Sequence, residues 1–343
     1  MQNLEKLTIV IPTYNRPEFV LRNMRYWSGK GCTVIVMDGS LTPIAESQLN
    51  GLAVNIQYVH SPVGLTERLL QACDMIQTPY ASMLSDDDFF SEQGISEAID
   101  ELNENTSYAC VNGNCASFLW KASEQQISTR MHYAEQAQFE MLQEQSRDRL
   151  LTHFRHYTPV SCYGVHRTAG FKLAMRAAAH KNSCIYSAEL AFELVTAWLG
   201  KTKTIPHCYW LRSMENEPVN VPGSPRSFRF HHWYTDPKYV KEVESWYVHI
   251  SAVLGFRPGP ERVNFYRTLR QSCENFMDFC REYFAGQNRA ERENPGCWQN
   301  TAENWQVRGV KVSSDIVEFL DQVKQFHMQS DHHSLPSVIL ESV

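Results

Sequence analysis

Short apolar, β-branched runs alternate with helical patterns over the first ninety residues of the chain. Four such runs predict buried strands, at residues 7–11, 33–37, 54–59 and 81–84. Pro17 falls in the first turn of the helix expected after the first strand, and Asn15 is placed to cap that helix. Gly64 is expected to open the helix before the fourth strand. Strands and helices that alternate in this order favour a right-handed α/β sheet with parallel neighbours.

The rest of the chain gives a coarser pattern. It predicts helices at 94–102 and 187–199, strands at 108–111, 160–165 and 202–211, and a polar, mostly helical stretch at 121–156. From residue 216 the composition shifts to Pro, Gly and Ser, and helices are expected again up to about residue 324. We therefore expect an α/β domain at 1–215, a mainly helical region at 216–330 and a loose tail at 331–343.

Composition excludes several classes of protein. With 343 residues, 43% apolar and 20% charged, the chain has the make-up of a globular protein of one or two domains. A net charge of −6 and the lack of a basic run argue against nucleic acid as a partner. The sequence shows neither a membrane-spanning apolar stretch nor a signal-peptide layout, so we expect a cytoplasmic location. The ten cysteines form no C-x-x-C pair, which favours reduced thiols in the core.

Three consecutive aspartates, Asp86, Asp87 and Asp88, follow the fourth predicted strand. Adjacent carboxylates at the end of a buried strand repel one another and are costly to desolvate, so a divalent cation with oxygen ligands is a natural counter-charge. The alternative is a polar turn that caps the next helix. In a parallel sheet, Thr13 and Asp38 would lie at the same carboxyl edge as Asp86, which is where ligands of such sheets bind.

Three motifs occur in a fixed order: V-I-P-T-Y-N-R-P at 10–17, V-M-D-G-S at 36–40 and L-S-D-D-D at 84–88. Together they resemble the nucleotide-sugar glycosyltransferases of the GT-A fold, closest to family 2. The resemblance covers about residues 7–212 and implies a GT-A type, Rossmann-like mixed sheet flanked by helices, with a mainly helical C-terminal region. It makes residues 1–215 the donor-binding and catalytic domain, and leaves acceptor binding, closure or oligomerisation to residues 216–330.

The resemblance also implies a reaction. A sugar would pass from a nucleoside-diphosphate sugar, with UDP as the default nucleotide, to a hydroxyl acceptor in surface glycan or glycoconjugate synthesis, with inversion. By the same likeness the donor is bound by Pro12, Thr13, Tyr14, Asp38, Asp86 and Asp87. Asp88 would bind Mn²⁺ or Mg²⁺ directly and Asp86 would assist through ribose or water. Family members often have two acids before Gly-Ser, whereas this chain has only Asp38.

An inverting transferase needs a base for the acceptor hydroxyl. The resemblance points to Glu189, at the start of the helix expected at 187–199, with Glu193 as a fallback and Glu215 as a third candidate. The alternative is that Glu189 only complements the helix N-terminus. Arg68 and Arg212 are candidate phosphate contacts, and the alternative for Arg68 is an exposed helix residue.

Residues 224–234 mix cations with aromatic rings, which suits an acceptor or closing loop. A peripheral contact with the inner face of the membrane is a second interpretation, and a core position for the aromatic rings is a third. Trp246 and Tyr247 could lie on a homodimer face. Two other functions compete: a nucleotidyltransferase, which would want a Gly-rich loop after the first strand, and a non-catalytic glycan- or partner-binding module.

Overall fold

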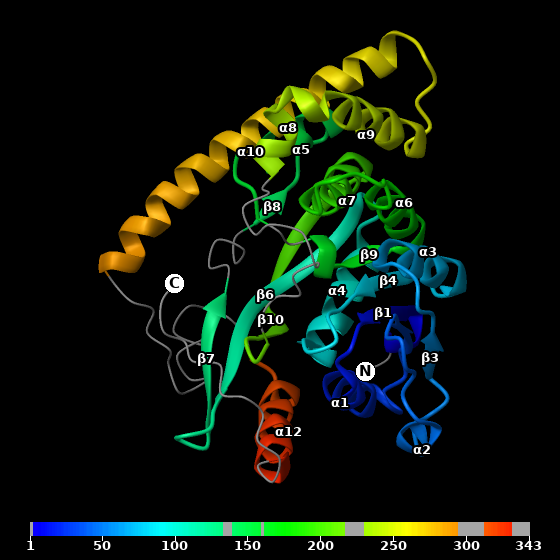
Figure 1. Cartoon of the computed structure of the whole chain (residues 1–343), viewed down its shortest axis with the longest axis vertical. Helices are drawn as coiled ribbons and strands as arrows, with labels where there is room; N and C mark the ends of the chain where they lie inside the picture. Colours follow the sequence, from blue (N-terminus) through cyan, green and yellow to red (C-terminus); the bar gives the residue numbers. More distant parts are fainter. Residues whose placement is uncertain (1–2, 133–138, 159–160, 217–229, 294–311, 331–343) are drawn as a thin grey trace.

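One mixed β-sheet runs through the structure (Figure 1). The computed structural model describes residues 3–132, 139–158, 161–216, 230–293 and 312–330. In these residues the strand order is β3-β2-β1-β4-β9-β6-β10-β5, with β7 paired to β6 and β8 to β10. The strands are β1 (Leu7–Thr13), β2 (Thr33–Asp38), β3 (Ile56–His60), β4 (Tyr80–Met83), β5 (Phe89–Phe90), β6 (Tyr108–Lys121), β7 (Gln126–His132), β8 (Glu140–Met141), β9 (Val165–Arg167) and β10 (Lys201–Ser213).

The first four strands form the predicted parallel half of the sheet. β1 pairs in parallel with both β2 and β4, and β2 pairs in parallel with β3. The register joins Thr13 to Asp38, so these two residues end neighbouring strands at the same edge. β9 is antiparallel to both β4 and β6, whereas β6 and β10 are parallel to each other. The expected mixed sheet is therefore confirmed.

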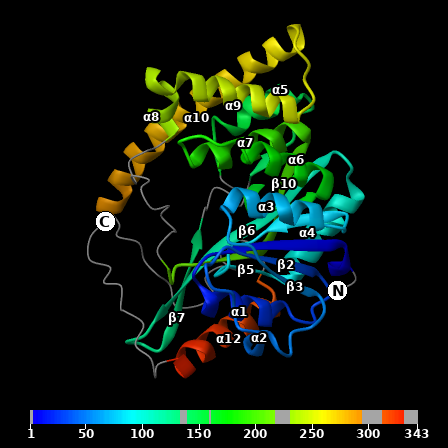
Figure 2. The same cartoon turned by 45° about the vertical axis from the view of Figure 1, so that its right-hand side comes forward.

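Helices cover both faces of the sheet (Figure 2). Those described are α1 (Pro17–Trp27), α2 (Glu46–Leu49), α3 (Leu65–Met75), α4 (Glu92–Glu104), α5 (Ser146–His153), α6 (Thr168–Ala178), α7 (Tyr186–Leu199), α8 (Phe230–Thr235), α9 (Val240–Val253), α10 (Pro260–Glu293) and α12 (Ser314–Ser330), with short 3₁₀ turns at Leu4–Lys6, Ser161–Tyr163 and Pro237–Tyr239. Figure 2 shows α1 and α12 on one side of the sheet and α3, α6 and α7 on the other.

Alternate side chains of each buried strand enter two separate cores, as the twofold periodicity of a strand requires. On β1, Ile9 and Ile11 pack toward α1 and α4, whereas Val10 packs toward α3, α6 and α7. On β2, Val34 and Ile35 divide in the same way. Burial on both faces explains why these strands read as unbroken apolar runs in the sequence.

Each of the C-terminal helices packs into one of these two cores. α8, α9 and α10 extend the core that holds Val10, through Trp233, Trp246 and Phe265. α12 belongs to the opposite core, where Ile316 and Phe319 are almost fully buried. The division of the chain at residue 215 stays a prediction.

Three expectations about local structure are wrong. Asn15 does not cap α1, because it has a left-handed backbone conformation (φ 55°) and Arg16 occupies the cap position. The stretch at 121–156 is not mostly helical, since β6 continues to Lys121 and turns into β7, and only α5 is helical among its described residues. The strand expected at 160–165 is instead a 3₁₀ turn at Ser161–Tyr163 followed by β9.

The aromatic segment at 224–234 is described only from residue 230. Its first part, together with most of the Pro-Gly-Ser loop and the expected tail, lies outside the described residues. Phe230 and Trp233 are buried in the core, and so is Trp246. The core interpretation therefore holds for these three rings, which are too deeply buried to contact a membrane or a second copy of the chain. Across the residues described, no helix combines the length and the apolar character needed to cross a membrane.

Gly113 gives a stability prediction for the centre of the sheet. A Cβ atom at Gly113 would lie 2.1 Å from the Tyr209 Cβ and 2.9 Å from the His207 carbonyl oxygen. We expect Gly113→Ala to lower the free energy of unfolding by about 1–3 kcal/mol, because β6 and β10 would have to move apart. Urea unfolding followed by circular dichroism measures the change.

Gly170→Ala is the matched control. In α6 the nearest atom to a new Cβ is the Leu199 Cδ1, at an ordinary contact distance of 3.4 Å. This variant should be neutral or more stable by up to about 1 kcal/mol, since alanine favours the helix over glycine. Equal destabilisation by both substitutions would contradict the crowding argument.

Candidate functional site

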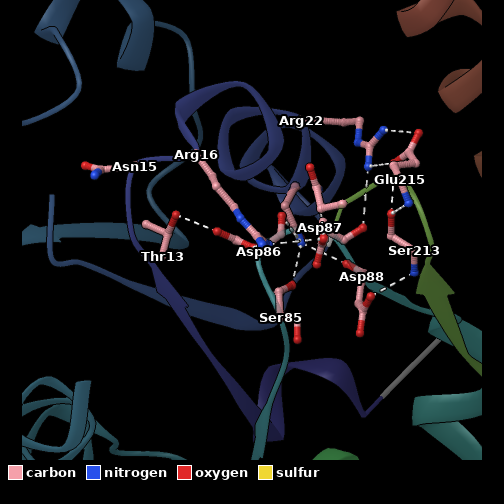
Figure 3. Close-up of polar contacts among 12 residues, drawn as sticks. Thr13, Asn15, Arg16, Arg22, Ser85, Asp86, Asp87, Asp88, Ser213 and Glu215 are labelled. Carbon is pink, nitrogen blue, oxygen red and sulfur yellow. Dashed lines mark hydrogen bonds and ion pairs between the residues drawn. The ribbon is translucent and has the colours of Figure 1, made fainter. Parts of the chain in front are cut away.

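The candidate site lies where β1, β2 and β4 end. Thr13 and Asp38 are register partners at the ends of β1 and β2. Asp86 follows β4 and accepts a hydrogen bond of 2.7 Å from the Thr13 hydroxyl. The predicted meeting of these three residues at one sheet edge is therefore confirmed. Figure 3 shows the hydrogen bond between Thr13 and Asp86.

The acidic turn, residues Ser85–Asp88, is held through its backbone. The Asn23 side-chain amide, buried on α1, donates to the carbonyl oxygens of Ser85, Asp86 and Asp88 at 3.3, 3.3 and 2.8 Å. A single side chain with three carbonyl partners fixes the shape of the turn before any carboxylate binds a ligand.

Two of the carboxylates share a cation. Arg16 Nη1 lies 3.2 Å from Asp86 Oδ1 and 3.3 Å from Asp87 Oδ2. Asp87 Oδ2 also accepts from the Asn216 amide at 2.9 Å. All three aspartates are buried, with 8% exposure at Asp87 the largest value. Arg16 therefore offsets part of the repulsion between buried like charges.

Asp88 is bound from β10. Its two carboxylate oxygens accept hydrogen bonds from the Ser213 backbone N–H at 2.8 Å and the Trp210 indole N–H at 2.9 Å. Each oxygen keeps a second lone pair. Arg212 lies between these two donors in sequence, and burial, the largest cause, raises the pKa of Asp88 while the two hydrogen bonds and the charge of Arg212 oppose the rise. β10 thus sets the orientation of the residue predicted to bind the metal.

Burial still disfavours the ionised forms of the acidic turn despite these hydrogen bonds and ion pairs. Burial, then the charge of Asp87, raises the pKa of Asp86 to about 6, although Thr13 and Arg16 oppose the shift. Burial and Asp87 raise the pKa of Asp88 as well. The protein therefore keeps carboxyl groups where their charged forms are unfavourable.

Asp38 is ordered by two donors. Its carboxylate accepts from the Ser40 backbone N–H at 2.8 Å and from the Tyr58 hydroxyl at 2.6 Å. Burial and this hydrogen bond raise the pKa of Tyr58 to about 12, so the phenol stays protonated and donates. Tyr14 is 47% exposed next to this edge, and Pro12 is partly buried. Their predicted nucleotide contacts stay predictions.

Arg68 is not the exposed helix residue of the alternative interpretation. It is only 4% exposed, and its Nη1 donates to the carbonyl oxygens of Thr13 and Met37 at 2.5 and 2.7 Å. Its guanidinium packs on Gly39, where a Cβ would lie 2.4 Å from Cζ. Arg68 thus joins the ends of β1 and β2, and a phosphate contact for it stays a prediction.

Glu189 lies in the first turn of α7 and is partly buried. The Tyr157 hydroxyl donates to its carboxylate at 2.6 Å. Burial raises the pKa of Glu189, the Tyr157 hydrogen bond opposes this shift, and the charge of Glu193 adds to it. A carboxylate with a raised pKa accepts a proton more readily, which suits a general base.

The other two base candidates are occupied elsewhere. Glu193 is fully buried and accepts from the Ser161 N–H and hydroxyl, at 2.9 and 2.6 Å, and lies 3.0 Å from His153 Nε2. Glu215 is paired with Arg22, and its pKa is held at about 2. A group with so low a pKa is a poor proton acceptor.

Sequence reasoning missed the residues that support the acidic turn. These are Arg16, Arg22, Asn23, Trp210 and Ser213. Asn23 carried a usable signal, because at helical spacing it falls beside Val20 and Trp27 on an apolar stripe of α1. Polar side chains at core positions need hydrogen-bond partners.

The donor set of the acidic turn fits a divalent cation that is also held by its substrate. Among the described residues no three His, Cys, Asp or Glu side chains are arranged to hold a metal ion by themselves. Asp86 and Asp88 nevertheless supply hard oxygen ligands, and hydrogen bonds fix the orientation of both. Mg²⁺ is commonly bound by one or two carboxylates together with substrate phosphates, and this donor set fits that pattern.

A cavity of about 240 Å³ lies apart from this site. Its lining comes from Phe139, Glu140, Met141, Thr152, His153, His156 and Thr158. None of the predicted site residues lines it. His166 is also away from the edge, since it is 1% exposed on β9 and bonded to the Ser161 carbonyl oxygen.

The chain was compared with known families, curated proteins and solved structures, and the family model agrees with the motifs. Residues 8–169 match the family model described as Glycosyl transferase family 2. None of the curated proteins matches the sequence. The solved structure of S. aureus TarS 1-349 in complex with UDP-GlcNAc has 12% identity and a TM-score of 0.47, and the match covers 82% of this chain and 92% of that one. S. aureus TarS has 14% identity and a TM-score of 0.42, covering 79% and 54%. A structural likeness this distant carries no conclusion about the activity of the chain.

The buried His166 gives a pH prediction. Burial lowers its pKa to about 4, below the ordinary value of 6.5, so the folded state holds the ring neutral. Its stabilising contribution is complete above pH 6.5 and is lost as the pH falls toward 4, by up to about 3 kcal/mol. The raised pKa values of Asp86 and Asp88 change the stability in the opposite direction over this range, so His166 is measured as a difference between two proteins. Between pH 7 and pH 5 the free energy of unfolding in urea should change less favourably in the native protein than in His166→Gln. Parallel pH profiles for the two proteins would contradict this assignment.

Proposed function

From the match of residues 8–169 to the family model described as Glycosyl transferase family 2, we propose that this chain transfers a sugar from a nucleoside-diphosphate sugar to a hydroxyl of a glycan or glycoconjugate. The observation that carries the proposal is the acidic turn. Three buried aspartates stand at the carboxyl edge of the sheet, beside Thr13 and Asp38, with hydrogen bonds fixing each of them. Ligands of parallel α/β sheets bind at this edge.

In this proposal Asp88 binds a Mn²⁺ or Mg²⁺ ion and Asp86 assists. The cation supplies Lewis-acid stabilisation of the departing diphosphate, so no protein proton donor is needed for the leaving group. Trp210 and Ser213 keep the Asp88 oxygens in place. Arg16 holds Asp86 and Asp87 together. UDP is our first choice of nucleotide, by the family resemblance.

Glu189 is the proposed base. Its pKa is raised, and Tyr157 orients its carboxylate through a 2.6 Å hydrogen bond. The carboxylate would take the proton of the acceptor hydroxyl as that oxygen attacks the sugar. A single displacement of this kind inverts the configuration at the anomeric carbon. Glycosyl transfer is also favoured over nucleotidyl transfer, because the segment after β1, residues 12–16, has no Gly-rich loop for a triphosphate.

Metal-dependent donor binding is the first test. We expect one of UDP, GDP, CDP or CMP to raise the melting temperature in the presence of Mn²⁺ and to lose this effect with EDTA, because a ligand of the folded state stabilises it by mass action. Asp88→Asn should weaken metal-dependent binding by about 100-fold or more while the fold survives. Asp74→Asn, on the exposed side of α3, is the matched control and should bind normally.

Normal binding and turnover by Asp88→Asn would contradict the assignment of Asp88 as the metal ligand. If the native protein binds no nucleotide with Mn²⁺ present, that result favours a non-catalytic binding module, or a donor site that forms only with the acceptor, over the proposed site.

Glu189→Gln separates chemistry from binding. The variant keeps a side chain that the Tyr157 hydroxyl can bond but removes the base, so we expect kcat to fall about 10²–10⁴-fold with little change in donor affinity. Release of the nucleoside diphosphate in the presence of an acceptor measures turnover. Glu67→Gln, exposed on α3, is the control. Unchanged turnover in Glu189→Gln would show that another group acts as base.

A further inference from the structure

A buried charge cluster lies directly behind the acidic turn. Glu215 stands two residues after the end of β10 and is paired on one side with Arg22 of α1, whose Nη2 lies 2.6 Å from Oε2. On the other side its Oε1 contacts His327 Nε2 of α12. The side chains of Arg22, Glu215 and His327 are 8%, 4% and 9% exposed. A single carboxylate is therefore enclosed by two nitrogen donors from distant parts of the chain.

The direction of the His327 hydrogen bond follows from charge. Burial raises the pKa of Glu215, but Arg22 and His327 outweigh it and hold the pKa at about 2. An ionised carboxylate only accepts hydrogen bonds, so the proton lies on His327 Nε2. The imidazole also stacks on Trp120, with ring centroids 5.2 Å apart and an interplanar angle of 8°. His327 thus makes two separable contacts, one polar and one aromatic.

Glu215 connects this cluster to the donor site. Its carboxylate accepts from the Ser213 hydroxyl at 3.0 Å, and the Ser213 N–H is a donor to Asp88. Arg22 Nη2 also lies 3.4 Å from the Asp87 carbonyl oxygen (Figure 3). Asn216, next in the chain, donates to the Asp87 carboxylate. The segment Ser213–Asn216 therefore carries donors to two of the three aspartates, and Glu215 is its anchor.

Helix α12, which carries His327, is held in place by contacts of its own with the rest of the protein. Asp315 accepts from the Glu92 N–H at 2.7 Å, and the hydroxyls of Ser313 and Ser91 lie 3.0 Å apart. Phe319 packs on Phe89, directly after the acidic turn, with ring centroids 3.9 Å apart. These contacts hold the helix on the face of the sheet that carries α1.

We propose that His327 is a positioning residue of the donor site: by donating to Glu215 it fixes the segment Ser213–Asn216, which in turn orients Asp88 and Asp87 toward the metal-bound diphosphate. The inference rests on the proposed function of the acidic turn. It assigns α12 to the donor site, although the helix follows the matched family region by more than a hundred residues in sequence. The histidine touches neither donor nor acceptor, and acts only through Glu215.

Two substitutions of His327 separate its contacts. His327→Phe keeps an aromatic ring against Trp120 but has no donor for Glu215. His327→Gln loses the ring and can place an amide N–H where Nε2 stood. Lys324→Ala, exposed on the same helix, is the control. Each full-length protein is titrated with Mn²⁺ at a fixed concentration of the nucleotide that the native protein binds, and turnover is measured across the same range of Mn²⁺.

His327→Phe should need about 10–100 times more Mn²⁺ for half-maximal nucleotide binding, the loss usual when a supporting hydrogen bond to a metal ligand set is removed. His327→Gln should lie within about threefold of the native value, and Lys324→Ala should match it. At saturating Mn²⁺ the turnover of His327→Phe should recover, which a general loss of folded protein would not allow.

Native Mn²⁺ affinity in His327→Phe, or equal loss in His327→Phe and His327→Gln, overturns the positioning role and leaves the proposed function standing. Absence of nucleotide binding by the native protein overturns both. If His327→Phe fails to fold, Glu215→Gln replaces it, since it keeps the shape of the anchor and removes its charge. Unchanged Mn²⁺ affinity in that variant also overturns the inference.

Discussion

The burial of three adjacent carboxylates is the constraint on which the rest of this structure depends. Asp86, Asp87 and Asp88 follow a buried strand, and none of them is more than 8% exposed. A fold can keep such a group only by supplying donors and counter-charges, because an unpaired buried carboxylate is strongly unfavourable. The protein does so from two directions. Asn23 within α1 and Arg16 at its N-cap contribute from one side, and Trp210 and Ser213 of β10 contribute from the other.

These supports account for features that look unrelated in the fold. α1 is amphipathic, but its buried face includes Arg22 and Asn23 because that face packs on the turn as well as on the core. β10 continues to Ser213, far enough to deliver the Asp88 donors. Arg68 joins the ends of β1 and β2 through two carbonyl oxygens, which keeps Thr13 beside Asp86. Hydrogen bonds therefore connect the edge of the sheet on both sides of the turn.

The parts of the site that the sequence predicted are those set by local chemistry and by sheet periodicity. Thr13, Asp38 and Asp86 could be placed together because each lies at or just after the end of a strand whose apolar run is unmistakable.

β7 could not be predicted in the same way. It is a hairpin partner of β6 outside the parallel core, and its pattern, Gln-Ile-Ser-Thr-Arg-Met, has no long apolar run. The contacts of Glu215 with Arg22 and with His327 could not be predicted for another reason. Glu215 is 193 residues from Arg22 and 112 from His327, and no local pattern encodes such pairings.

The docking of α12 has a consequence for how the protein is made. Glu92 and Asp315 are 223 residues apart, and His327 reaches back to the segment that follows β10. During synthesis on the ribosome, the parallel strands and α1 can assemble long before residue 327 has been translated. The acidic turn can therefore form before the helix that completes its surroundings has been made. Contacts of such long sequence separation also slow folding, because much of the chain must be ordered before they form. A nascent chain of this protein carries its most unfavourable charges without their full support until residue 327 has emerged.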